Sequence, residues 1–354
     1  MSLSIAIVGL PNVGKSTLFT ALTKKGGLAA NYPFATIEPN VGVVPVPDRR
    51  LEVLGKIDNA KKIIPASVEF VDIAGLVEGA SKGEGLGNQF LANIRECDAI
   101  CEVVRYFSDA DVVHVDGRVD PASDAEIIKT ELVLADIATV EKAIPRIEKD
   151  SKRDKSFILK LDTARHVLQQ LNKGVRAINI DLSEEERECI RDLHLLTSKP
   201  LLYIANVDED QLTNSFDAID GAIPVAVCAK TEADLCELDD QTAAEFLSVI
   251  GMKESGLVRL INNAYKLLGL QSYFTSGVQE TRAWTIPIGA KAPQAAGAIH
   301  SDFERGFIKA ETASYADYVE FGGDLGCRNA GKLRQEGKEY VVQDGDVMHF
   351  KFNV

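Results

Sequence analysis

Residues 9–17 read Gly9-Leu10-Pro11-Asn12-Val13-Gly14-Lys15-Ser16-Thr17. Their spacing matches G-x-x-x-x-G-K-[ST], the pattern of a phosphate-binding loop. The apolar run at residues 3–8 predicts a buried strand before the loop, and residues 18–25 predict a helix after it. A chance glycine-rich turn would lack these two flanks, so the stretch predicts a phosphate site.

Each position of such a loop has a physical role. Gly9 and Gly14 allow the tight turn that brings main-chain N–H groups, at the positive end of a helix dipole, against the phosphates. Lys15 would lie between the β- and γ-phosphates, and Ser16 would offer its hydroxyl to Mg²⁺. The residues expected to bind the nucleotide here are Asn12, Val13, Gly14, Lys15, Ser16 and Thr17.

The composition is that of an ordinary soluble protein, with 354 residues of which 45% are hydrophobic and 26% charged. This length suggests two or three domains. The chain has no long uninterrupted apolar run and no basic segment followed by an apolar one at its N-terminus, so we expect a cytoplasmic protein without a membrane partner. The six cysteines form no C-x-x-C pair, so neither a zinc site nor a disulfide framework is indicated.

The net charge of −14 argues against a protein that wraps duplex DNA over its surface. Any contact with RNA would need a local basic patch. Cations near the C-terminus could form such a patch or could simply be solvated. They are Lys291, Arg305, Lys309, Arg328, Lys332, Arg334 and Lys338.

Three further residues would complete the phosphate site. Thr36 follows a run of turn formers and could complete the Mg²⁺ shell when the γ-phosphate is present; the alternative is a threonine that begins the next strand. Asp72 ends a second buried strand, where a carboxylate can hold Mg²⁺ through water. Gly75 could give its N–H to the γ-phosphate, and the four glycines in residues 79–87 suit a segment that becomes ordered only around a triphosphate.

The position that orients the attacking water in many GTPases carries an apolar residue here. Leu76 stands where those proteins have glutamine, so hydrolysis is either slow or depends on another group. His114 is a candidate, because a histidine with a pKa near neutrality can orient or deprotonate a water. An equally good interpretation makes His114 a structural, hydrogen-bonded residue.

A helical hairpin is predicted in the middle of the chain. Apolar residues recur three and four positions apart between residues 134 and 147 and again between 157 and 171, with a polar reversal at 149–155. This pattern predicts an antiparallel coiled coil whose first helix Pro145 would kink. Ser183 to Glu186 forms a capping box for a further helix toward Leu196. A charged hairpin is usually a solvated arm, and we interpret this one as a lever for binding a partner.

The segment that should contact the base departs from the GTPase pattern. A buried strand at 200–206 ends in Asn206-Val207-Asp208-Glu209, where GTPases have N-K-x-D. Val207 removes the lysine that packs over the base, and the longer Glu209 does not fit the guanine edge, so each misplaced hydrogen bond costs about 1–3 kcal/mol. Guanine preference should collapse, and adenine becomes admissible. Cys228 and Ala229, after the next strand at 223–227, occupy the place of the second loop that touches the base.

A helix at 257–268 is expected to close the nucleotide domain. After it, short strands around Trp284-Thr285-Ile286, a turn at Asp344-Gly345 and a last strand at 347–352 predict a small α+β module with one helix.

These motifs together resemble the YchF subfamily of Obg-related P-loop proteins over essentially the whole chain. The resemblance rests on the phosphate loop, on Asp72-Ile73-Ala74-Gly75-Leu76, on Asn206-Val207-Asp208-Glu209 and on Asp344-Gly345-Asp346-Val347-Met348-His349-Phe350. It implies an α/β P-loop NTPase with a doubly wound sheet, an inserted helical coiled-coil hairpin and a C-terminal α+β, ubiquitin-like TGS domain. The implied boundaries are 1–124 with 200–274 for the nucleotide domain, 125–199 for the arm and 275–354 for the TGS domain.

The resemblance also implies ATP hydrolysis in preference to GTP, and binding to the 50S or 70S ribosome and its RNA. It supports Ser16 and Thr36 as Mg²⁺ ligands and His114 as a substitute for the missing glutamine. Related proteins can bind K⁺ at the position of Asn12, which leaves a K⁺ site open here.

Our first hypothesis is therefore a Mg²⁺-dependent ATPase that works as a slow nucleotide switch on ribosomes. Its rivals are a GTPase factor of the Obg group, acting in translation or ribosome assembly, and a nucleotide-regulated scaffold with negligible turnover.

Overall fold

The computed structural model describes residues 3–25, 41–73, 85–108 and 119–353. Within them the chain divides into two compact units, one of residues 3–42 and 69–260 and one of residues 43–68 and 261–354. The three-part division expected from the sequence stays a prediction. No described helix combines the length and the apolar composition needed to cross a bilayer.

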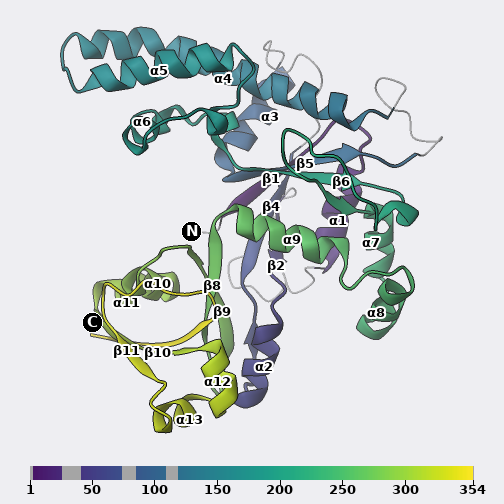
Figure 1. Cartoon of the computed structure of the whole chain (residues 1–354), viewed down its shortest axis with the longest axis vertical. Helices are drawn as coiled ribbons and strands as arrows, with labels where there is room; N and C mark the ends of the chain where they lie inside the picture. The colour runs from purple at the N-terminus through teal and green to yellow at the C-terminus, as the bar shows by residue number, and fades with distance from the viewer. Residues whose placement is uncertain (1–2, 26–40, 74–84, 109–118, 354) are drawn as a thin grey trace. The chain divides into compact units, whose positions relative to one another are not determined.

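The first unit is built on a six-stranded sheet (Figure 1). The strand order is β2 (Val41–Pro45), β4 (Ser67–Asp72), β1 (Ser4–Val8), β5 (Ala99–Arg105), β6 (Leu201–Asn206) and β7 (Val225–Val227). The pairs from β4 through β1, β5 and β6 to β7 are all parallel. Strand β5 is buried along its whole length, as expected for a central strand covered on both faces.

Register brings the ends of these strands to one edge of the sheet. Ile7 lies opposite Asp72, and Arg105 lies opposite Asn206. Because the carboxyl ends of parallel strands meet at the same edge, the loops that follow β1, β4, β5 and β6 converge there. The predicted strands are thus confirmed with small changes of boundary, and the edge where a ligand binds in such folds is defined.

Five helices flank these strands outside the segment between β5 and β6, and the last of them, α9, begins in this unit and continues into the second from residue 261. Their bounds are α1 (Lys15–Lys25), α3 (Gly85–Glu96), α7 (Ala229–Leu235), α8 (Asp240–Val249) and α9 (Gly256–Leu267). Helix α1 begins at Lys15, three residues before the predicted start, so its first turn belongs to the phosphate loop itself.

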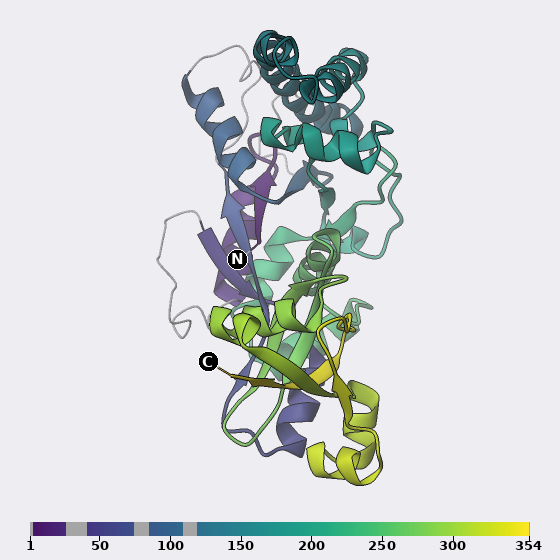
Figure 2. The ribbon, with the colours of Figure 1, turned by 90° about the vertical axis from the view of Figure 1, so that its left-hand side faces the viewer.

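The predicted hairpin is present as α4 (Pro121–Ser151) and α5 (Phe157–Leu171), which lie side by side in both views (Figures 1 and 2). Val140, Ile147 and Leu161 are among the residues of its own hydrophobic core. Asp120 caps the start of α4 by accepting a hydrogen bond from the Ser123 N–H. Helix α4 continues through Pro145, so proline does not end it.

The helix that follows the hairpin is shorter than predicted. The capping box of Ser183 and Glu186 is confirmed, but α6 (Glu184–Cys189) ends well before Leu196. The 3-10 turns η3 (Ala177–Asn179), η4 (Arg191–Leu193) and η5 (Leu196–Ser198) carry the chain back to β6.

Asp136 of α4 anchors this return. It is fully buried, and its carboxylate accepts hydrogen bonds from the Leu196 N–H at 2.8 Å, the Thr197 N–H at 2.8 Å and the Thr197 hydroxyl at 2.6 Å. Burial raises the pKa of Asp136, and the hydrogen bonds from Thr197 and Leu196 act against that rise.

We expect Asp136→Ala to destabilise the protein, because it leaves two buried main-chain N–H groups without their acceptor at about 1–3 kcal/mol each. Urea unfolding would measure the loss. Asp162→Ala, an exposed aspartate of α5, is the matched control and should change the free energy of unfolding little. Equal stability of the two variants would contradict the prediction.

The second unit is a mixed six-stranded sheet in the order β11-β10-β12-β8-β9-β3. The strands are β3 (Ile63–Ile64), β8 (Leu270–Thr275), β9 (Thr281–Pro287), β10 (Phe307–Ser314), β11 (Arg334–Glu336) and β12 (Asp346–Phe352). Strand β12 pairs with β8 in parallel and with β10 antiparallel, and β9 pairs antiparallel with β8. In the C-terminal module the first strand, β8, and the last strand, β12, lie parallel at the centre of the sheet. This is the ubiquitin-like arrangement, so that part of the predicted fold class is confirmed.

The predicted single helix of this module is wrong, since its described residues contain four. They are α10 (Ala292–Ile299), α11 (Ser301–Arg305), α12 (Tyr315–Phe321) and α13 (Asp324–Asn329). Each is eight residues or fewer, which is too short to show a helical period in the sequence.

Residues 43–68 also belong to this unit, which the sequence did not indicate. They supply α2 (Arg49–Ile57) and β3. Arg50 of α2 pairs with Asp344 at 2.7 Å, and Asp58 accepts a 2.8 Å hydrogen bond from the Tyr318 hydroxyl. The Asp344-Gly345 turn is therefore held by a segment almost 300 residues earlier in the chain.

Candidate functional site

The phosphate loop has the backbone that its sequence predicts. Asn12 and Gly14 both have positive φ, at 63° and 87°, so the loop turns tightly before α1. A Cβ on Gly14 would lie 2.2 Å from the Asn206 side-chain nitrogen, and one on Gly9 would lie 2.8 Å from the Val103 carbonyl oxygen. Glycine is required at both positions, at Gly14 by conformation and space and at Gly9 by close packing on β5.

Lys15 and Asp72 meet at this loop. The Lys15 ammonium forms an ion pair with the Asp72 carboxylate, and both side chains are largely buried. The pairing follows from the register of β1 and β4, which ends both strands at the same level. Asp72 thus lies beside the group expected to contact the β- and γ-phosphates.

Ser16 and Asp72 suit Mg²⁺ chemically. Both offer oxygen, and Mg²⁺ is usually held by one or two protein groups together with phosphates and water. Both line the same cavity, where Ser16 is exposed. No group of three or more His, Cys, Asp or Glu in the described residues could hold a metal by itself. The residues present therefore fit a metal that binds together with a triphosphate.

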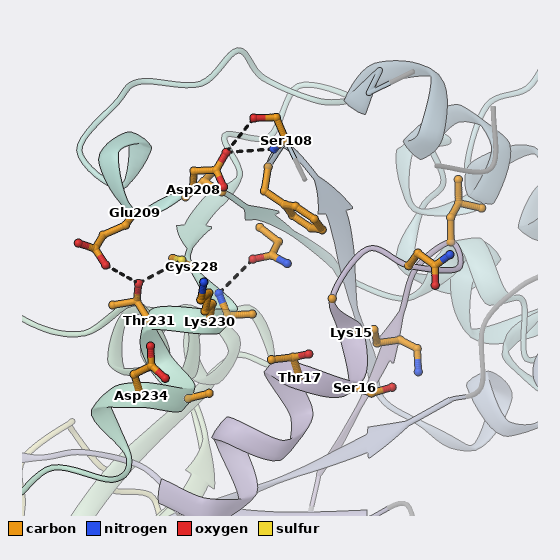
Figure 3. Close-up of a pocket in the computed structure, with 18 of the residues that line it drawn as sticks. Lys15, Ser16, Thr17, Ser108, Asp208, Glu209, Cys228, Lys230, Thr231 and Asp234 are labelled. Carbon is orange, nitrogen blue, oxygen red and sulfur yellow. Dashed lines mark hydrogen bonds between the residues drawn. The ribbon is translucent and has the colours of Figure 1, made fainter. Parts of the chain in front are cut away.

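A single cavity of about 1230 Å³ joins the phosphate loop to the predicted base loops (Figure 3). Lys15, Ser16 and Thr17 line one side, and Glu209 and Thr231 line the other. Except for Val13, the predicted nucleotide-binding residues in the described part of the chain all line it. They are Asn12, Gly14, Lys15, Ser16, Thr17, Asn206, Val207, Glu209, Cys228 and Ala229.

Asn206 connects three parts of this cavity. Its side-chain N–H₂ donates to the Val13 carbonyl at 2.8 Å, and its side-chain oxygen accepts from the Ala229 N–H at 3.0 Å. The residue is 5% exposed. One amide therefore ties the phosphate loop, the end of β6 and the loop after β7 into one rigid frame. Val13 contributes through this bond and through its buried side chain.

Glu209, at the position of the guanine-reading aspartate of GTPases, is hydrogen-bonded through its carboxylate to another residue of the cavity wall. Glu209 begins the 3-10 turn η6 (Glu209–Gln211) and accepts a 3.1 Å hydrogen bond from the Thr231 hydroxyl. That hydroxyl also lies 3.2 Å from the Cys228 sulfur. Val207 is almost fully buried in a small apolar cluster, so it does not present a long side chain over the base.

Asp208 also lines the cavity and is hydrogen-bonded to the loop that follows β5. Its carboxylate accepts hydrogen bonds from the Ser108 N–H at 3.0 Å and the Ser108 hydroxyl at 3.2 Å (Figure 3). The neighbouring Phe107 ring lines the cavity, and the Arg105 guanidinium lies 4.3 Å from its centroid. The loop after β5 is thereby fastened to the loop after β6, with an aromatic ring between them.

Several predicted site residues lie outside the described part of the chain. These are Thr36, Gly75, Leu76 and His114, so their roles stay predictions. Conversely, the sequence analysis did not assign Phe107, Ser108, Asp208 or Thr231 to the site. Phe107 and Ser108 directly follow β5, so the rule that ligands bind at the carboxyl edge of parallel strands could have found them.

Comparison with known proteins agrees with this geometry. A family model described as 50S ribosome-binding GTPase matches residues 4–129, and a YchF C-terminal model described as a protein of unknown function matches residues 270–353. The chain is 55% identical to the Ribosome-binding ATPase YchF of Escherichia coli O157:H7 and 52% identical to that of Bacillus subtilis (strain 168), over 100% of both chains in each case. The chain belongs to the YchF family.

A solved structure of the YchF family supports the fold. The YchF GTPase of Schizosaccharomyces pombe is 39% identical, with a TM-score of 0.90 over 99% of this chain and 98% of that one. The relatives thus carry two activity names, ATPase and GTPase. The P-loop fold class with an inserted hairpin and a C-terminal ubiquitin-like module is confirmed for this YchF-family chain.

Proposed function

We propose that this protein is a Mg²⁺-dependent ATPase that binds ribosomes and acts as a slow nucleotide switch. The observation that carries the proposal is a single cavity in which a phosphate loop faces a base loop with Glu209, held by Thr231, where GTPases have aspartate. A carboxylate so held is displaced from the guanine edge, and it can accept a hydrogen bond from the adenine N6–H₂. Relatives that match this chain over their full length and are named ribosome-binding ATPases support both halves of the proposal.

Within this function, Lys15 binds the phosphates, Ser16 and Asp72 hold Mg²⁺, and Thr36 completes the metal shell when the γ-phosphate is present. Asp72 acts through water. Gly75 senses the γ-phosphate, and His114 takes the place of the glutamine that Leu76 replaces. A K⁺ ion beside Asn12 would add positive charge near the phosphates. The ribosomal partner, the 50S or 70S particle and its RNA, implies the cytoplasm as the place of action.

The base preference tests this proposal against a GTPase of the Obg group. We expect ATP to bind more tightly than GTP by about tenfold or more, because guanine would leave buried hydrogen-bonding groups unpaired. Competition of ATP and GTP against a fluorescent nucleotide on the full chain measures the ratio. GTP binding tighter by about tenfold would end the ATPase proposal.

A conservative substitution tests whether the Glu209 carboxylate selects the base. Glu209→Asp shortens the side chain, draws it from Thr231 and should reduce the preference for ATP several-fold. Glu237→Asp makes the same chemical change on an exposed glutamate outside the cavity and should leave the ratio unchanged. Identical ratios in both variants and wild type would remove Glu209 from base selection.

The rate of ATP turnover distinguishes the proposed ATPase from a nucleotide-regulated scaffold. Phosphate release with and without ribosomes and K⁺ measures it, and a negligible rate under every condition would favour a scaffold without hydrolysis.

A further inference from the structure

Four exposed cations follow one another along the last turns of α4 and the turn after it. Lys142, Arg146, Lys149 and Arg153 are spaced four, three and four residues apart, the first three within α4 and the last just after it. On a helix with 3.6 residues per turn this spacing keeps the three cations of α4 on one narrow face, and Arg153 follows in the turn after the helix. All four side chains are exposed. We call these four residues the cationic row.

The cationic row lies on the side of α4 away from the hairpin's own core. The buried residues Val133, Val140 and Ile147 are seven positions apart and pack against α5. At 100° per residue, their mean direction is about 150° from that of the row. The apolar face of α4 is thus already covered, and the row faces solvent.

None of the four side-chain charges makes an ion pair or hydrogen bond with any residue that the structure describes, whereas two of their acidic neighbours have partners. Glu148 is shared by Lys152 at 3.4 Å and Arg165 at 3.7 Å. Asp154 accepts a hydrogen bond from the Ser156 N–H. Asp150 is half-buried at the flank of the row. Residues 141–155 contain six cations and four acids, in a chain whose net charge is −14.

The C-terminal cations that the sequence singled out are in a different state. Lys291 pairs with Glu339 at 2.6 Å, Lys332 with Asp317 at 3.3 Å, and Arg328 with Glu311 at 3.5 Å. Arg305 and Arg334 also have acidic partners. Five of the seven are thus paired within the module, whereas Lys309 donates to the neutral Gln335 and Lys338 is exposed without an acidic partner among the described residues. The cationic row therefore holds more unpaired cations than this C-terminal set.

We propose that the cationic row binds the phosphate backbone of RNA, as the contact of the arm with the ribosome. The rise of 1.5 Å per residue separates Lys142, Arg146 and Lys149 by about 6 and 4.5 Å along α4. A series of exposed, unpaired cations suits a regular row of phosphates, where each contact releases a condensed counterion. This inference rests on the ribosome binding proposed above and assigns that binding to one surface.

RNA fits this surface better than a lipid bilayer. A helix that lies on a membrane inserts its apolar face beside its cations. In α4 that face is buried against α5, so it is not available to lipid. Attraction by the row is therefore electrostatic alone and should be strongly salt-dependent.

The test compares two full-length variants with the same change of charge. The first is Lys142→Gln, Arg146→Gln, Lys149→Gln and Arg153→Gln. The second, its control, is Lys291→Gln, Arg305→Gln, Arg328→Gln and Lys332→Gln, which removes two lysines and two arginines that have acidic partners. A third variant, Lys142→Arg with Lys149→Arg, keeps the charge of the row.

We expect the first variant to bind a short RNA duplex and purified ribosomes about tenfold or more weakly, with the salt slope of log K reduced by about 3. The control and the charge-keeping variant should bind as wild type. All variants should retain the thermal midpoint and the basal hydrolysis rate of wild type, since the row is remote from the nucleotide residues in sequence and carries no internal bond.

Other outcomes overturn the inference in distinguishable ways. If wild type binds ribosomes and the first variant does so equally, the row is not the contact, while the proposed function stands. Loss in the control alone would assign the contact to the C-terminal module. Wild type that binds neither ribosomes nor the RNA duplex would remove both proposals. Row-dependent binding to vesicles of phosphatidylserine and phosphatidylcholine, without binding to RNA, would identify a membrane surface instead.

Discussion

Replacing Lys15 by alanine is expected to lower the rate of ATP hydrolysis by about 10²- to 10³-fold, the usual effect of removing one charged group aimed at developing negative charge. Lys15 is 9% exposed at the start of α1, in the wall of the nucleotide cavity. Its low exposure limits screening by solvent, so its ammonium interacts strongly with a phosphate. The affinity for ATP should fall as well, because the same charge binds the β- and γ-phosphates before reaction.

Phosphate release under saturating ATP, with a competition assay for affinity, measures both effects of Lys15→Ala. The matched control is Lys24→Ala at the other end of the same helix, where an exposed lysine pairs with Glu237. Thermal unfolding of both variants shows whether the loss of the pair with Asp72 alters the fold. Hydrolysis by a folded Lys15→Ala protein at the wild-type rate would show that residues 9–17 are not the phosphate site.

Asn206→Ala is expected to weaken ATP binding by at least about 30-fold. The change leaves the Val13 carbonyl and the Ala229 N–H without their buried partner, at about 1–3 kcal/mol each. Two such losses correspond to about 2 kcal/mol or more, and 1.4 kcal/mol is a factor of ten in affinity. The loss appears in binding because the phosphate loop and the base loop then move independently, and the ligand must order both.

A competition assay gives the affinity of Asn206→Ala for ATP, and urea unfolding gives the part of the cost that falls on the free protein. Asn172→Ala serves as control, since this exposed residue at the end of α5 also donates from its side chain to a main-chain carbonyl. ATP affinity equal in wild type and Asn206→Ala would contradict the role of Asn206 as the joint of the cavity.

Much of the nucleotide unit could be predicted because its signals are local. The phosphate loop carries its own glycines and its lysine, and the spacing of apolar residues in α4 and α5 specifies a hairpin within one continuous stretch. The capping box at Ser183 satisfies helix N–H groups three residues away. Such contacts join residues only a few positions apart, so their spacing can be read directly from the sequence.

The C-terminal unit was harder because its decisive contacts join distant segments. Strand β3 has two residues and exists only by pairing with β9, more than 200 positions later. Arg50 reaches Asp344, and Asp58 reaches Tyr318, across similar separations. No local pattern predicts such pairings, and the short helices α10 to α13 lack enough turns to show a period.

The nucleotide site shows the same division. Sequence order alone placed Asn206, Glu209 and Cys228 near a base, because each follows a buried strand. Only the fold revealed that Asp208 fastens the loop bearing Phe107 and that Thr231 holds Glu209. Those contacts arise from strand register, which brings three loops to one edge.

The sequence by itself determined that this chain has a phosphate-loop motif, an amphipathic hairpin and, at the expected base loop, residues that depart from the GTPase pattern, because each is encoded by spacing within a few turns or strands. The tertiary structure decided which side chains are neutralised and which are left to act. Charges many residues apart meet or miss one another only through packing, and so Lys291, Arg328 and Lys332 are paired with acids while Lys142, Arg146, Lys149 and Arg153 face solvent.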